Sequence, residues 1–126
     1  MELQHDISCI RKDRKMVDNQ AHGGVALFFY SNLCSFTKFH LNSLKGPEVR
    51  DFEILACKGR MRGVKREIVV FSCYLPPGIG GTELARIQEA LTDAISEAKL
   101  KANSPWMIIG GDFNSCLLYT SPSPRD

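Results

Sequence analysis

A carboxylate and a carboxamide stand two residues apart after an apolar stretch. Asp112 and Asn114 follow the apolar residues 106–109 and a Gly-Gly pair. Because side chains alternate along extended backbone, both should point to one side while Phe113 points back toward the core. A carboxylate can hold a metal ion or orient an attacking water, and an amide can donate a hydrogen bond to a phosphoryl oxygen. The pair suits phosphoester chemistry, although Asp-x-Asn is also a common turn sequence.

A tyrosine supplies a second candidate. Tyr74 ends an apolar run over residues 67–74, just before a Pro-Pro-Gly turn. Its phenol can hydrogen-bond a phosphate oxygen, although a tyrosine at a strand end can equally leave its hydroxyl in water. The order strand, glycine-rich loop, helix, strand can bring Tyr74, Asp112 and Asn114 to one rim of a sheet, where sites on open sheets usually lie. Gly110 and Gly111 are expected to leave room there for a substrate backbone.

Hydrophobic periodicity predicts the elements that must position these residues. Strands are predicted at residues 7–11, 25–30, 52–58, 67–74 and 106–109, with a strand or irregular loop at 33–44. Residues 68–71 have no polar face, which favours a central strand covered on both sides, and the strands at 25–30 and 106–109 are also expected to be buried. A helix beginning at Thr82, with Thr82 as its cap, carries an apolar face of Leu84, Ile87, Leu91, Ala94, Ile95 and Ala98. The class is therefore α/β or α+β, with a mixed sheet and covering helices.

Bulk properties place the chain among globular proteins. With 126 residues, 44% of them hydrophobic and 24% charged, it suits one small domain or part of one. No apolar run approaches the roughly 20 residues that span a bilayer, and no secretory leader opens the chain. We expect an intracellular protein, nuclear or cytoplasmic, that is neither secreted nor membrane-bound. Five cysteines stand singly, which favours buried reduced thiols over disulfides or zinc ligands.

Cationic residues crowd two short segments, although the net charge is only +2. The cationic segment at residues 58–66 carries Lys58, Arg60, Arg62, Lys65 and Arg66, and its residues 59–66 should join two strands as a hairpin. Arg11, Lys12, Arg14 and Lys15 crowd the other. Such a cluster can contact nucleic-acid phosphates, or it can be a solvated loop.

The last residues differ abruptly in character. Residues 116–126 resemble, residue for residue, one translated reading frame of a transposase-type sequencing adapter. A natural Ser/Pro-rich linker is the alternative. We treat this tail as non-native, assign residues 1–115 to the domain, and expect the natural coding sequence to continue past Ser115.

Three segments together resemble the endonuclease/exonuclease/phosphatase superfamily. They are residues 108–114 (Ile-Ile-Gly-Gly-Asp-Phe-Asn), 74–78 (Tyr-Leu-Pro-Pro-Gly) and 22–28 (His-Gly-Gly-Val-Ala-Leu-Phe). The likeness is greatest to the apurinic-type endonuclease domain of non-LTR retrotransposon polyproteins, which often show an Arg-x-Asp-Arg stretch such as residues 11–14. It covers about residues 5–114 and implies part of a four-layer α/β/β/α sandwich of the DNase I-like fold.

The resemblance also implies site residues and partners. Asp112 would orient or activate the nucleophilic water, Asn114 would contact the scissile phosphate, and Tyr74 would bind phosphate. The implied cofactor is Mg²⁺, the implied partner is DNA, and a reverse transcriptase domain could follow in the parent polyprotein. The family's main metal-binding acid and its late catalytic histidine match no residue here. We therefore expect an interior fragment of the domain, inactive alone.

Two other interpretations stay open at this point. The domain could instead be a phosphatase or sphingomyelinase-type member of the superfamily, which acts on a small phosphoester. The chain could also be a truncated translation product without function.

Overall fold

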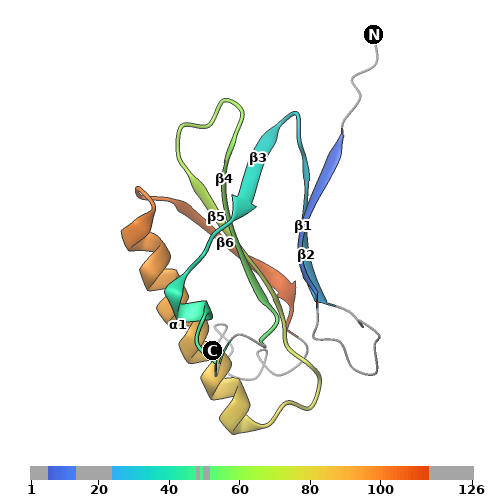
Figure 1. The fold of residues 1–126 in the computed structure, drawn as a ribbon, viewed down its shortest axis with the longest axis vertical. Helices are drawn as coiled ribbons and strands as arrows, with labels where there is room; N and C mark the ends of the chain where they lie inside the picture. The colour runs from blue at the N-terminus through green and yellow to red at the C-terminus, as the bar shows by residue number, and fades with distance from the viewer. Residues whose placement is uncertain (1–5, 14–23, 48, 50–51, 114–126) are drawn as a thin grey trace, which may run out of the picture.

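A computed structural model describes residues 6–13, 24–47, 49 and 52–113, and it contains two sheets and one long helix (Figure 1). The elements run in the order β1 (Ile7–Asp13), β2 (Gly24–Tyr30), β3 (Cys34–Lys38), the 3-10 turn η1 (Asn42–Leu44), β4 (Ile54–Met61), β5 (Ile68–Tyr74), α1 (Gly81–Lys101) and β6 (Trp106–Asp112). Strands β1 and β2 pair antiparallel as a separate ribbon. The second sheet has the order β3-β4-β5-β6, antiparallel except for the parallel pair β5 and β6. The mixed sheet and the α+β class are confirmed.

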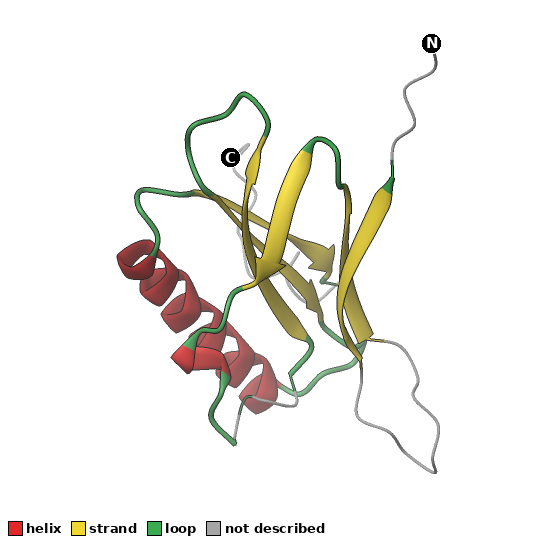
Figure 2. Cartoon of the chain, turned by 45° about the horizontal axis from the view of Figure 1, so that its top comes forward, coloured by secondary structure: helices red, strands yellow, loops and turns green. Residues whose placement is uncertain are grey.

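The four-stranded sheet lies between α1 on one face and the β1–β2 ribbon on the other (Figure 2). Phe71 of β5 packs toward Ala94 and Ala98 of α1. On the opposite face, Leu55 of β4 packs against Val25 of β2. Both faces of the sheet therefore exclude water at its centre, which is where hydrophobic burial stabilises the fold most.

Strand β5 is the central strand that the sequence predicts. It has a hydrogen-bonded neighbour on each side, and Val69 and Phe71 have no exposed surface. Ser72 alternates to the other face, where its Oγ donates a hydrogen bond to the Ala26 carbonyl at 3.1 Å. This bond ties the two sheets together through an otherwise apolar contact.

Helix α1 confirms the predicted apolar face but not its cap. Ile87, Ala90, Ala94 and Ala98 are buried, as the helical spacing requires. The N-cap is Gly80, in extended conformation and without a side-chain hydrogen bond, so the prediction that Thr82 caps the helix is wrong. The helix begins before Thr82, which places the threonine inside the first turn, beyond the cap position.

Two strands are less buried than predicted. In β6, Trp106, Ile108 and Ile109 are 49%, 52% and 42% exposed. The apolar run predicts a buried strand, but within the described residues β6 is an edge strand that pairs only with β5. Strand β2 is buried on its inner face, while Phe28 on its outer face is 67% exposed. The outer side of the β1–β2 ribbon therefore presents apolar side chains to solvent.

The cysteines divide into buried and accessible thiols. Burial raises the pKa of the Cys57 and Cys73 thiols to about 11, with a small opposing effect of the Lys38 charge on Cys57. Cys9 lies on the outer face of β1 and is exposed, so the expectation of buried thiols fails there. The four described cysteines are free, and Cys116 lies outside the described residues.

Among the residues that the structure describes, no helix has the length and apolar character that crossing a membrane requires.

Glu97 of α1 holds the turn η1 in place. Its carboxylate accepts hydrogen bonds from the Asn42 amide at 2.6 Å and from the Ser43 amide and hydroxyl at 2.8 and 2.7 Å. The Lys101 ammonium lies 2.7 Å away, and the Glu97 side chain is only 15% exposed. Burial alone would raise the pKa of Glu97, but the hydrogen bonds from Lys101, Ser43 and Asn42 outweigh it and lower the pKa to about 2.

Replacing Glu97 with glutamine should remove a pH-dependent part of the stability. The folded carboxyl has a pKa of about 2 against an ordinary value of 4.5, so its contribution is present above pH 4.5 and is lost as the pH falls toward 2. We expect Glu97→Gln to lower the free energy of unfolding near neutral pH by about 1–3 kcal/mol and to flatten its decline in acid. Urea unfolding at several pH values measures both effects. Glu89→Gln, an exposed change on the same helix, is the control, and an equal effect of the two changes would contradict this role.

Candidate functional site

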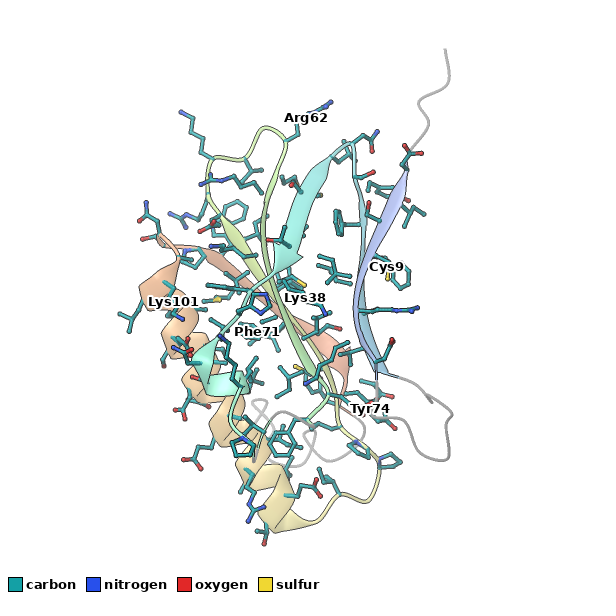
Figure 3. All side chains as sticks on the ribbon, viewed as in Figure 1. Cys9, Lys38, Arg62, Phe71, Tyr74 and Lys101 are labelled. Atoms are coloured by element: carbon teal, nitrogen blue, oxygen red, sulfur yellow. The ribbon has the colours of Figure 1, made fainter. Side chains whose placement is uncertain are left out.

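The structure brings Tyr74 and Asp112 together. They are register partners in the parallel pair of β5 and β6, and both lie at the C-terminal ends of their strands. The Leu75 amide donates a hydrogen bond to the Asp112 carbonyl at 2.8 Å, which closes the ladder at this end. Figure 3 shows Tyr74 at the end of the sheet remote from Arg62. Asn114 lies outside the described residues.

Gly111 allows the end of β6 to approach β5. Its φ of 135° is rare for residues with a side chain, and a Cβ added there would lie 1.9 Å from the Cys73 carbonyl oxygen. A Cβ on Gly110 would meet no atom within 4 Å. The expectation that both glycines leave room for a substrate is therefore wrong for Gly111, because the β5 backbone occupies that space. Gly110 alone leaves open space.

Tyr74 is held from two directions. Its ring packs against the cluster of Val25, Leu55 and Cys57 between the two sheets, so the side chain is half-buried. Its amide donates a hydrogen bond to the Glu53 carbonyl at 2.9 Å. Packing and backbone pairing together restrict the positions that the phenol can occupy, and this favours a fixed hydrogen-bonding role over a mobile one.

Two charged residues join this end of the sheet although the sequence does not mark either as a site residue. Glu53 precedes β4, and its bond to Tyr74 places it on the opposite side of Tyr74 from Asp112. The Lys12 ammonium, from β1, donates a hydrogen bond to the carbonyl of Phe52, the residue before Glu53. We call Lys12, Glu53, Tyr74 and Asp112 the rim. The hairpin register could have located Glu53, whereas the Arg-x-Asp-Arg stretch contains Lys12 but does not indicate that it lies at this end of the sheet.

The rim supplies ligand types that suit a hard cation. Mg²⁺ is usually held by one or two carboxylates together with waters. Glu53, directly before β4, and Asp112, at the end of β6, are carboxylate residues that flank Tyr74 in the backbone pairing. Within the described part of the chain, no group of three or more His, Cys, Asp or Glu side chains could by itself hold a metal ion. The rim therefore contains two residues of the ligand type that Mg²⁺ prefers, and a magnesium site would need further ligands.

The cationic segment lies at the other end of the sheet. Strand β5 begins next to the hairpin and ends at Tyr74, and its six steps of about 3.3 Å separate the two ends by about 20 Å. Within the segment, the Lys58 ammonium lies 4.7 Å from the Phe39 ring centroid, and the Arg66 guanidinium lies 5.8 Å from that of Trp106. The residues are therefore not one uniform cluster, and none of them borders the rim.

Comparison with protein-family models, curated proteins and solved structures found no match.

Proposed function

We propose that this chain carries part of the active site of a divalent-metal-dependent phosphodiesterase. The observation that supports the proposal best is the register of Tyr74 against Asp112 at the C-terminal ends of adjacent parallel strands. Two residue types suited to phosphate chemistry, chosen from sequence segments 38 positions apart, meet at the edge where sites on open sheets usually lie.

Each residue has a defined part in the proposed reaction. The Asp112 carboxylate is exposed and orients a water for attack on phosphorus, accepting a hydrogen bond from it. The Tyr74 phenol donates a hydrogen bond to a phosphate oxygen, and the Asn114 amide donates another as charge develops in the transition state. Magnesium, when bound, neutralises phosphate charge. The Tyr74 ring is already packed, so its alignment requires little further ordering.

Within this class, we assign the substrate as DNA and the parent as a non-LTR retrotransposon endonuclease. The three motif segments that resemble this family support the assignment, as does the concentration of arginine and lysine at one end of the sheet. The exposed apolar outer face of the β1–β2 ribbon, with Phe28 and Tyr30, supports a further covering layer and hence the four-layer DNase I-like sandwich. The metal-binding acid and late histidine of that family match no residue here, so the 126-residue chain alone is proposed to be inactive.

Magnesium-dependent nicking of supercoiled plasmid DNA tests this function. We expect a chain extended at both ends in its natural reading frame to nick the plasmid with Mg²⁺ and to stop when the metal is chelated. The 126-residue chain should not nick above background, because hydrolysis needs a metal ligand, a water activator and transition-state donors together. Hydrolysis of sphingomyelin or inositol phosphates by the extended chain without nicking would refute the DNA assignment. Nicking that survives chelation would refute the metal dependence.

A further inference from the structure

We propose that the end of the sheet opposite the rim binds the phosphate backbone of nucleic acid. This hairpin end consists of Arg60, Arg62, Lys65 and Arg66 around the β4–β5 turn, together with Trp106 at the start of β6. Its binding role does not require phosphodiesterase chemistry, although its failure would remove one of the supports for DNA as the substrate.

The turn that carries these cations is fixed by hydrogen bonds. The Arg60 Nη1 donates to the Lys65 carbonyl at 2.9 Å, across the turn. The Arg62 amide donates to the Leu33 carbonyl at 2.7 Å, which ties the hairpin to the β2–β3 turn. Gly63 adopts a φ of 81°, a conformation that glycine accepts without strain. A fixed backbone loses less conformational entropy when its side chains bind a partner.

The charges of the hairpin end remain available to an anion. Arg62 and Lys65 are exposed, and neither forms an ion pair with a described residue. Beside them, a shallow groove of about 300 Å³ runs between the hairpin and the β2–β3 turn. Most of its exposed surface is apolar, and its lining residues are Arg60, Arg62, Ser31, Asn32, Ser35, Leu33, Cys34, Met61 and Val64. The two cations and the small polar side chains among them can contact sugar and phosphate without reading sequence.

An aromatic surface adjoins these cations. The Trp106 ring is about half exposed and carries the Arg66 guanidinium over it, with 5.8 Å between the guanidinium carbon and the ring centroid. Aromatic rings and guanidinium planes are surfaces on which bases stack. A lipid surface could also use the cations and the ring, but stacking of a base on the ring is specific to nucleic acid, so we commit to nucleic acid as the partner.

The separation of the two ends sets a length requirement. The hairpin end and the rim lie about 20 Å apart along β5, which corresponds to about 6 base pairs at 3.4 Å each. A nucleic acid that contacts both ends must therefore run along the sheet for at least that distance. A shorter one can occupy the hairpin end alone.

Trp106 provides a built-in reporter because it is the only tryptophan in the chain. Two titrations use a short DNA duplex of random sequence. The anisotropy of a fluorescein-labelled duplex reports binding of the 126-residue protein, and the fluorescence emission of Trp106 is followed as unlabelled duplex is added. We expect both signals to change with the same midpoint. Binding should weaken as salt rises from about 50 to about 200 mM, since each neutralised phosphate releases counterions. Anisotropy that rises while Trp106 emission stays constant would place the DNA elsewhere and overturn the proposal.

A charge-removal pair tests which cations act. Arg62→Gln with Lys65→Gln should weaken binding about tenfold and reduce the slope of log affinity against log salt by about two. Arg60 is left unchanged because its guanidinium holds the turn. Arg86→Gln with Lys45→Gln removes the same charge from exposed positions on α1 and after η1 and should change binding little. Equal losses in the two double variants would mean that net charge alone acts, which overturns the proposal.

Two further measurements separate this proposal from its alternatives. Binding of the duplex to the 126-residue protein is measured with Mg²⁺ chelated, where no hydrolysis is expected, so a failure of the phosphodiesterase assignment does not alter this result. Vesicles containing phosphatidylserine should bind more weakly than the duplex at equal salt. Tighter binding to the vesicles, lost in the Arg62 and Lys65 double variant, would assign the hairpin end to a membrane surface instead of nucleic acid.

Discussion

Replacing Gly111 with alanine is expected to separate the end of β6 from β5 and to destabilise the fold by more than about 4 kcal/mol. The new Cβ would lie 1.9 Å from the Cys73 carbonyl oxygen, far inside van der Waals contact, at a φ of 135° that residues with a side chain rarely adopt. The obstacle is backbone of the central strand, so no side-chain rotation relieves it. Urea unfolding followed by circular dichroism measures the loss, which is a large share of the 5–15 kcal/mol typical of a domain.

Gly110→Ala is the matched control for this change. It adds the same methyl group one residue earlier in β6, where no atom lies within 4 Å. We expect its free energy of unfolding to stay within about 1 kcal/mol of the unchanged protein. If the two substitutions destabilised the protein equally, the close approach of Gly111 to Cys73 would not be what limits this position.

Replacing Asp112 with alanine is expected to lower the nicking rate of the extended, active chain by about a hundredfold or more. Removing one preorganised group from an active site commonly has an effect of this size, because nothing else then orients the water. Asn114→Ala should show a comparable loss. The measurement is the initial rate of plasmid nicking at saturating Mg²⁺, and thermal melting of the variant checks that the fold persists. The Asp112 side chain is exposed, so its loss should scarcely affect stability.

Asp93→Ala removes an exposed carboxylate on α1 and should leave nicking unchanged. The double replacement of Asp112 and Asn114 gives the decisive result. Undiminished nicking in that variant would show that neither residue takes part in the reaction, and the phosphodiesterase assignment would lose its main support.

Much of the fold follows from local patterns. The helical spacing of residues 84–98 predicts α1, and the unbroken apolar run of residues 68–71 predicts the covered central strand. The same reasoning overestimates the burial of β6, because an apolar run does not reveal whether a strand lies in the middle of a sheet or at its edge. That position depends on pairing partners, which the run itself does not encode. Trp106 and Ile108 are exposed for this reason.

Part of the candidate site can likewise be predicted from the sequence, and part depends on strand pairing. Tyr74 and Asp112 could be placed at one rim because a strand, helix, strand order gives parallel neighbours whose ends coincide. Glu53 needs the exact register of the β4–β5 hairpin, which depends on where the turn falls within the cationic segment. The sequence predicts that Gly111 leaves space for a ligand, because a glycine indicates that a side chain does not fit but not which group excludes it. Here the excluding group is Cys73.

The parallel pairing of β5 and β6 also bears on the order in which the chain folds. Strands β4 and β5 are joined by a short turn, so little entropy is lost when they meet. Tyr74 and Asp112 are separated by the whole of α1, which must form and pack before β6 can reach its place. Contacts between residues far apart in the sequence form late, because chain entropy is lost before the contacts contribute stabilising energy. We therefore expect the β4–β5 hairpin to form before β6 pairs with β5, so that Tyr74 and Asp112 come together late in folding.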